Sequence, residues 1–433
     1  MGGGLVQLAA YGSQDVYLTT NPQITFFKSV YQRSTNFAME SIIQLIDGNI
    51  NFGGNITIVV ARNGDLLGDI TLQVGMPNPV NYINSPENYD YIGWIQSVGN
   101  YLVKYICIEI GAQMIDEQYG QWLDIWSQLN LSESHITGYS QMVGKNFNVP
   151  AWKPYNTSSE PGSRLFVPLQ FWFCRNPGLA IPIIALQYHE IRIKITFEKF
   201  QNLIVGVTNG VYQPVSFTNS IPQFSSFQIF NTYYFLDTTE RRKFAQNPHE
   251  YLIEQVQSQS GNVKTLTGQN TIRLNLNHPT KELIWVFNRN GTNAPVNDFS
   301  IGTNIIPNGT TSQFAPLFNF KLIVNGTDRF KERPGEYFRL VQPYNHHTRV
   351  PGNYIYVYSF ALRPEEHQPS GTCNFSRIDT AQLDFYLRSN VIPGNIDGAP
   401  QENYTELPTY TIYAPCYNIL RIMGGMGGLS FSN

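Results

Sequence analysis

The sequence predicts an all-β protein made of two consecutive jelly rolls, each an eight-stranded antiparallel sandwich, with short helices in the loops. Three observations lead to this prediction: a composition rich in aromatic and turn residues, many short alternating strands, and a second half that repeats the first. Of the 433 residues, 14% are aromatic and only 14% are charged, and the chain has 35 Gly and 26 Pro. This composition argues against a helical bundle, a coiled coil and a disordered tail protein.

Strand-like runs fill the first half. Residues 56–60 and 69–74 flank Asn63-Gly64, a strong turn signal. The run 105–110 ends at Gly111, and residues 191–197 alternate strictly between apolar and polar side chains. Strict alternation predicts a strand with one buried and one solvent-facing side.

The second half repeats this pattern with runs at residues 271–276, 283–287, 321–324, 353–358 and 379–387. Helical patterns are few, and the two exceptions are residues 116–129 and 239–257. Two stacked antiparallel sheets with long crossing loops account best for each half.

The two halves correspond at a nearly constant offset. Anchor pairs lie 214 or 215 residues apart: Ile58 with Ile272, Ile70 with Ile284, Gly111 with Gly326, and Trp122-Leu123 with Tyr337-Phe338. Later, Leu165 matches Tyr354 at an offset of 189, so the first half should carry an extra loop of about 26 residues within 127–163. A repeat of this length indicates a duplicated domain. We therefore expect an N-terminal arm over residues 1–23, a first jelly roll over 24–212, and a second over 213–433 that ends in a C-terminal tail.

Bulk charge gives no support for nucleic-acid binding. The chain has 28 Lys and Arg against 31 Asp and Glu, a net charge of −3, and no basic stripe. A low density of charge causes little repulsion between copies, which suits a protein that packs against itself.

Catalytic and metal-binding motifs are absent from the sequence. It has no G-x-S-x-G elbow, phosphate-binding loop or H-E-x-x-H, and none of its seven histidines forms a His-x-His pair. On a strand, the adjacent His346 and His347 would point to opposite faces. Residues 364–367 could hold an ion but are more simply a polar loop, and His189 is predicted to be structural. We expect no cofactor, no metal site and no enzymatic activity. The alternatives are a glycan-binding double jelly roll and a metal-dependent or hydrolytic enzyme.

The remaining features also point to a structural protein. Cys107 and Cys174 lie in apolar runs, and no C-x-x-C pair occurs, so buried reduced thiols are expected. The N-terminus lacks the pattern of a signal peptide, and the longest apolar run, residues 179–186, is too short to span a bilayer. The glycine-rich residues 423–428 predict a flexible or tightly turning tail.

Eight Asn-x-Ser/Thr sequons occur in a chain that is rich in all three residue types. Attachment of a glycan requires an exposed loop. Asn290, Asn308 and Asn403 lie in turn-rich stretches and are the better candidates.

Three long motifs resemble one family, the major capsid proteins of nucleocytoplasmic large DNA viruses. They are AYGSQDVYLT with NPQITFFK (residues 10–28), FWFCRNPGLAIP continuing to LQYHE (171–190), and YSFAL through QPSGTCNFSR (358–377). The resemblance extends from near residue 4 to YNILR at 417–421, and the chain length is closest to the capsid proteins of algal viruses.

The resemblance implies a double jelly roll that forms homotrimers, and pseudo-hexagonal capsomers that tile an icosahedral shell. It implies contacts between capsomers and with minor capsid and penton proteins, and an internal viral membrane nearby without insertion into it. Covalent glycans and assembly in the host cytoplasm are further implications. The N-terminal arm would lie on the inner side, where it would contact neighbours or minor capsid proteins.

Two aromatic clusters fit such a scaffold. Phe171, Trp172 and Phe173 are consecutive, so on a strand they would present aromatic surface on both faces. Tyr354, Tyr356 and Tyr358 should share one strand face, with Ile355 and Val357 on the other. Either cluster could pack in a core or form an interface.

Overall fold

A computed structural model of the chain describes residues 2–145, 164–208, 211–220, 222–266, 268–288, 299, 315–387 and 407–431. The chain divides into two compact units, Met1–Phe37 and Ala38–Asn433. The first unit contains α1 (Gly3–Ala9) and α2 (Val16–Thr19), and none of its described side chains is buried. The arm expected over residues 1–23 is the first part of this unit. Among the described residues, no helix is long and apolar enough to cross a membrane.

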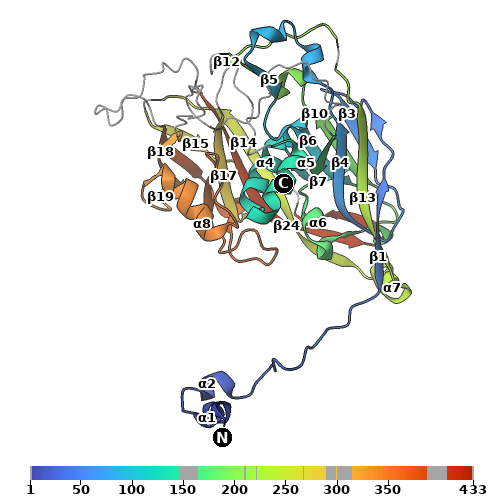
Figure 1. Cartoon of the computed structure of the whole chain (residues 1–433), viewed down its shortest axis with the longest axis vertical. Helices are drawn as coiled ribbons and strands as arrows, with labels where there is room; N and C mark the ends of the chain where they lie inside the picture. The colour runs from blue at the N-terminus through green and yellow to red at the C-terminus, as the bar shows by residue number, and fades with distance from the viewer. Residues whose placement is uncertain are drawn as a thin grey trace. The chain divides into compact units, whose positions relative to one another are not determined.

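Two antiparallel sheets form the first jelly roll (Figure 1). One sheet has the order β1-β13-β4-β8, and its strands are β1 (Phe37–Ile43), β4 (Leu66–Gly75), β8 (Arg164–Pro168) and β13 (Ser226–Leu236), with β9 (Ile181–Pro182) also paired to β4. The other has the order β2-β3-β10-β6-β7, with β2 (Asp47–Gly48), β3 (Asn55–Val59), β6 (Val103–Ile110), β7 (Gln113–Gln118) and β10 (Ile191–Phe197). A small third sheet consists of β5 (Tyr91–Trp94), β11 (Ile204–Thr208) and β12 (Val211–Gln213).

The second jelly roll has the same plan. Its first sheet contains β14 (His249–Asn262), β24 (Thr409–Met423), β17 (Glu282–Asn288) and β21 (Tyr356–Ser359), paired in that order, with β16 (Pro279–Thr280), β22 (Cys373–Asn374) and β25 (Met426–Leu429) added. Its second sheet has the order β15-β23-β18-β19, with β15 (Asn270–Arg273), β18 (Leu317–Val324), β19 (Thr327–Asp328) and β23 (Ala381–Leu387), and β20 (Arg333–Pro334) paired to β18.

Strand order confirms the predicted duplication. The sheet β1-β13-β4-β8 corresponds strand for strand to β14-β24-β17-β21, and β3-β10-β6-β7 corresponds to β15-β23-β18-β19. Ile58 and Ile272 each face the core of their own half. The pair Ile70 and Ile284 was matched one residue out of phase, because Ile70 lies in the first core and Ile284 lies outside the second.

The expected boundary between the halves, at residues 212 and 213, falls too early. Strand β13 begins at Ser226 and pairs with β4 along its length, so the first jelly roll needs residues up to Leu236. The chain then forms α7 (Thr238–Gln246) before β14 starts the second half.

The structure differs from the local sequence pattern at two places. The Asn63-Gly64 turn does not close a hairpin, because β3 pairs with β10 whereas β4 pairs with β13 in the other sheet. The helix expected over 239–257 ends at Gln246, since residues 249–262 pair with β24 instead and this pairing overrides the local pattern.

The remaining helices surround the first jelly roll and one edge of the second. They are α3 (Val98–Leu102), α4 (Gly120–Asn130), α5 (Glu133–Val143), α6 (Trp172–Arg175) and α8 (Gln342–His346), the last preceded by a π-helical turn, η6 (Tyr337–Val341). The helix expected over 116–129 begins only at Gly120, because residues 113–118 form β7. The extra segment expected within 127–163 contains α5.

Equivalent hairpins close β6 onto β7 and β18 onto β19. Both have two-residue loops with left-handed backbone: φ is 57° at Gly111 and 67° at Ala112, and 49° at Asn325 and 76° at Gly326. This geometry matches the twist of the flanking strands and favours glycine. Gly111 also lies against the ring of His189, whereas Gly326 faces open space.

These two glycines form a matched pair for mutation. Gly326→Ala adds only left-handed strain, which should cost about 1–2 kcal/mol of unfolding free energy. Gly111→Ala adds the same strain and places a Cβ 2.3 Å from His189 Nδ1, so we expect a further loss of roughly 1–3 kcal/mol. Urea unfolding of both variants measures the difference, and equal losses would show that His189 does not restrict this turn.

Candidate functional site

Helix α4 fills the junction between the two jelly rolls. Trp122, Ile125, Trp126 and Leu129 recur at the i, i+3, i+4, i+7 spacing of one helix face. They pack against strands of the second half, in one cluster with Val256, Ile284, Val286, Phe299, Ile355, Val357 and Tyr413. Leu123 faces the first core instead. The helix therefore has two buried sides, one for each half, and lies between the two sets of strands (Figure 1).

Aromatic and polar contacts fix the position of α4. The ring of Trp122 stacks on Trp126 at a centroid distance of 5.4 Å and meets Tyr413 at 5.3 Å. The Tyr413 hydroxyl donates to Gln121 Oε1 at 2.9 Å, and Gln121 Nε2 donates to Asn288 Oδ1 at 3.0 Å. Aromatic packing supplies the buried area, and the polar tips find partners across the junction.

The tyrosine row has the two faces that the sequence predicts. Tyr356 lies in the second core and Tyr358 packs against it, whereas Ile355 and Val357 belong to the α4 cluster; Tyr354 packs against both. Strand β21 thus contributes to the core with one face and to the junction with the other.

The strand predicted at residues 171–173 was wrong, whereas packing of their side chains in a core, one of the two predicted alternatives, is what the structure has. Trp172 and Phe173 begin the helical turn α6, and Phe171 precedes it as the N-cap. All three side chains are buried in the first core. Consecutive aromatic residues are compatible with a helical turn here because the core surrounds it.

Strands β14 and β24 form a ribbon that belongs to both cores. Their pairing runs without a break from His249–Ile422 to Asn262–Thr409. At one end, Ile253, Leu420 and Ile422 belong to the first core, and at the other, Ile412 and Ala414 belong to the second. The two halves therefore share continuous hydrogen-bonded strands, and neither core is complete without this ribbon.

The glycine-rich tail is a tight hairpin that contacts the first half. Gly424 and Gly425 have φ of 59° and 83°, and they return the chain into β25. His189 Nδ1 lies 3.0 Å from the carbonyl oxygen of Gly427, and Leu429 N donates to Gln113 Oε1 at 3.1 Å. His189, predicted to be structural, lies at this contact.

A chain of buried charges also crosses the junction. Arg175 of the first half lies 2.9 Å from Glu254 Oε2, and Lys281 Nζ lies 2.7 Å from Glu254 Oε1. The Lys281 side chain is fully buried and also donates to the carbonyl oxygen of Pro364 at 2.7 Å. Burial opposes ionisation of Glu254, but Arg175 and Lys281 outweigh it and hold the pKa of this carboxyl below its usual value.

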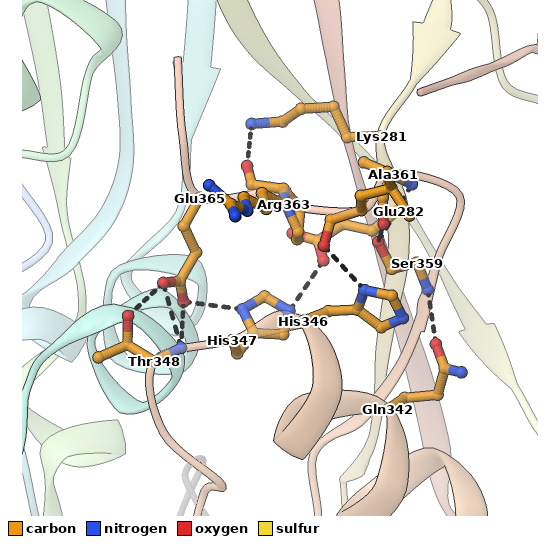
Figure 2. Close-up of polar contacts among 12 residues, drawn as sticks. Lys281, Glu282, Gln342, His346, His347, Thr348, Ser359, Ala361, Arg363 and Glu365 are labelled. Carbon is orange, nitrogen blue, oxygen red and sulfur yellow. Dashed lines mark hydrogen bonds and ion pairs between the residues drawn. The ribbon is translucent and has the colours of Figure 1, made fainter. Parts of the chain in front are cut away.

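His347 continues the chain inside the second half. Its Nε2 lies 2.9 Å from Glu282 Oε2 and its Nδ1 lies 2.9 Å from Glu365 Oε1, so both ring nitrogens face carboxylates (Figure 2). Two carboxylate acceptors require two N–H donors, which only the imidazolium has. Burial favours the neutral ring, but Glu282 and Glu365 outweigh it and raise the pKa of His347 to about 9. Glu365 also accepts from the backbone and hydroxyl of Thr348.

The cluster contains three cations, Arg175, Lys281 and His347, and three anions, Glu254, Glu282 and Glu365. This arrangement fits a structural role, because each ion is paired with an ion of opposite charge and the ions at the centre of the cluster are removed from solvent. Within the described part of the chain, no group of three or more His, Cys, Asp or Glu could hold a metal ion.

No sequence pattern predicted this cluster. Residues 364–367, predicted to be a polar loop, supply the Pro364 carbonyl and Glu365 to it. A signal existed in Lys281-Glu282, a charged pair directly before the apolar run 283–287. Its partners are far away in the sequence, so spacing could not identify them.

The remaining predicted residues are the glycosylation candidates and the cysteines. Asn290, Asn308 and Asn403 lie outside the described residues. The four cysteines are unpaired, and Cys107 is buried whereas Cys174 is partly buried. Burial raises the pKa of Cys174 to about 12, which makes that thiol unreactive.

Comparisons with known proteins cover almost the whole chain. A family model described as "Major capsid protein N-terminus" matches residues 25–237, and one described as "Large eukaryotic DNA virus major capsid protein" matches residues 240–428. The major capsid proteins of Phaeocystis pouchetii virus and of Paramecium bursaria Chlorella virus 1 are each 40% identical over the full length of both chains.

Solved structures agree with these matches. A chain of the PBCV-1 virus capsid superposes with a TM-score of 0.77 at 36% identity, covering 94% of this chain and all of that one. The Faustovirus major capsid protein has a TM-score of 0.71 at 13% identity, covering 97% and 96%, which supports the fold alone.

Removal of the central anion tests the charge cluster. Glu254→Gln leaves Arg175 and Lys281 without their shared carboxylate, so we expect a loss of about 3–5 kcal/mol in unfolding free energy. The control is Glu250→Gln on the same strand, whose ion pair with Arg421 is exposed and should contribute less than about 1 kcal/mol. Similar losses in urea unfolding would contradict a special role for the buried pairs.

The His347 cluster predicts a pH-dependent stability. Because the pKa rises from 6.5 to about 9 on folding, the contribution is complete below about pH 6.5 and is lost as the pH rises through about 9. The loss should amount to about 3 kcal/mol. Unfolding free energies at pH 6.5 and 9.5 measure it. His347→Gln should reduce this pH dependence, whereas the neighbouring His346→Gln should retain it, and an unchanged slope in His347→Gln would refute the assignment.

Proposed function

The chain belongs to the major capsid proteins of large eukaryotic DNA viruses, and we propose that it builds the virion shell as a homotrimer. Strand-for-strand duplication within one chain is the observation on which this proposal depends. Three chains around one axis would place six similar sandwiches in a ring. Such a pseudo-hexagonal capsomer can tile the facets of an icosahedral shell.

The junction supports this role, because a capsomer subunit must keep a constant angle between its two jelly rolls. Helix α4, the shared β14–β24 ribbon and the buried charges tie both jelly rolls together by three different kinds of interaction. A fixed angle between the halves is what a ring of six similar units requires. No comparison supports the glycan-binding alternative, and the relatives are structural capsid proteins, so we propose that this chain has no enzymatic activity.

The proposed partners are neighbouring capsomers and the minor capsid and penton proteins of the virion. The N-terminal unit supports such contacts because its large apolar side chains are exposed: Leu5, Val6, Leu8, Tyr11, Val16, Tyr17, Leu18, Ile24, Phe26, Phe27, Val30 and Tyr31. Covalent glycans at Asn290, Asn308 or Asn403, assembly in the host cytoplasm and a nearby internal membrane without insertion are part of the same proposal.

Light scattering coupled to size-exclusion chromatography tests the oligomeric state. The purified chain at micromolar concentration should have three times the mass of one chain, because a capsomer interface should bury more than roughly 2,000 Å² in total. Negatively stained particles should have hexagonal outlines. A strict monomer under these conditions would refute the trimer.

A further inference from the structure

The second jelly roll carries its own counterpart of helix α4. At the 215-residue offset, Leu123 corresponds to Phe338, and both face the core of their own half. The junction residues of α4, Trp122, Ile125, Trp126 and Leu129, then correspond to Tyr337, Leu340, Val341 and Tyr344. The second set occupies η6 and α8, which follow β18 and β19 just as α4 follows β6 and β7.

The counterpart residues differ from the originals in exposure. The four α4 side chains are at most 2% exposed, because the second half covers them. Leu340, Val341 and Tyr344 are 40%, 43% and 78% exposed. The chain thus repeats the apolar spacing of a docking helix and leaves most of that surface open.

The surface that would receive this helix is also repeated. Helix α4 covers Ile284 and Val286 of β17, which alternate with the core residues Leu283, Trp285 and Phe287. In the equivalent strand β4, Ile70, Leu72 and Val74 face the core and Thr71 and Gln73 alternate with them. On the neighbouring strand β8, Phe166 pairs with Gln73 and Pro168 pairs with Thr71. On the other neighbour, β13, Phe230 pairs with Thr71. All five of these outward side chains are partly exposed.

We propose that Leu340, Val341 and Tyr344 dock on the β4-β8-β13 face of a second copy of this chain. The contact between copies would then repeat the contact that α4 makes within one chain. Such an interface is heterologous, and it closes into a ring when the rotation between copies permits. This inference rests on the proposed trimer and specifies which surfaces form it.

The composition of both surfaces fits an interface between separately folded copies. Tyr337 and Val341 stand where α4 has Trp122 and Trp126, and the receiving face includes Thr71 and Gln73 among its aromatic residues. Tyrosine and partly polar rims are typical of interfaces that form after folding. The contact between copies should therefore be more polar than the contact within the chain.

The test uses the full chain with Leu340→Glu and Tyr344→Glu combined. Both side chains are exposed, so the variant should fold, with an unchanged circular dichroism spectrum. Sedimentation should show that trimer dissociation occurs at a chain concentration roughly 100-fold or more above that of the wild type. The control, Phe318→Glu with Tyr386→Glu, changes two exposed large side chains, 42% and 37% exposed, on the opposite sheet of the same jelly roll, and should remain a trimer.

A second measurement locates the contact directly. A photoreactive benzoylphenylalanine in place of Tyr344 should cross-link to another chain, within residues 66–75, 164–168 or 226–236. A wild-type trimer that tolerates both glutamates, cross-links to other segments, or a control that dissociates equally would overturn this assignment and leave the trimer standing. A monomeric wild type would overturn the trimer and this assignment together.

Discussion

Helix α4 has two buried sides, and the relation between the jelly rolls depends on it. A jelly-roll sheet normally buries one face and leaves the other in water. In the second half, the outward face of β17, of β21 and of the segment that leads into β21 carries Ile284, Val286, Ile355 and Val357, which would be an unfavourable apolar surface without a cover. The side of α4 that bears Trp122 and Trp126 provides that cover. The second sandwich therefore depends on the first one to cover this surface.

Apolar packing alone would hold the halves together without fixing their angle, because the hydrophobic effect has no direction. The buried ions add direction. Arg175, Glu254 and Lys281 must meet at hydrogen-bond distance, and a small rotation of one half would leave a buried charge unpaired. The net free energy of such pairs is modest, so we attribute to them specificity of geometry. For a subunit that must fit a lattice, specificity of geometry matters more than added stability.

Features that depend on local sequence pattern could be predicted from the sequence. Features that depend on contacts between distant segments could not. Alternation identified strands such as residues 191–197, and the offset between Ile58 and Ile272 identified the duplication. The helix expected over 239–257 ends at Gln246, and its second part was predicted wrongly because Tyr251, Leu252, Ile253 and Val256 have the spacing of a helical stripe. Tyr251 and Ile253 pack with the first core and Val256 packs in the junction cluster, because β14 passes from one to the other. The charge cluster escaped prediction because Glu365 and His347 approach Glu282 only through the fold.

Duplication imposes different demands on the two docking helices. The contact of α4 forms within one chain during folding, so the surface that carries Trp122 and Trp126 is covered once both jelly rolls have folded. A contact between copies forms only when separate chains meet. Until then, the surfaces that make it are exposed to water and to other unassembled subunits. A helix with two exposed tryptophans would invite aggregation during that interval. Tyr337 and Val341 in place of two tryptophans are the compromise expected if the same contact is made once inside the chain and once between chains.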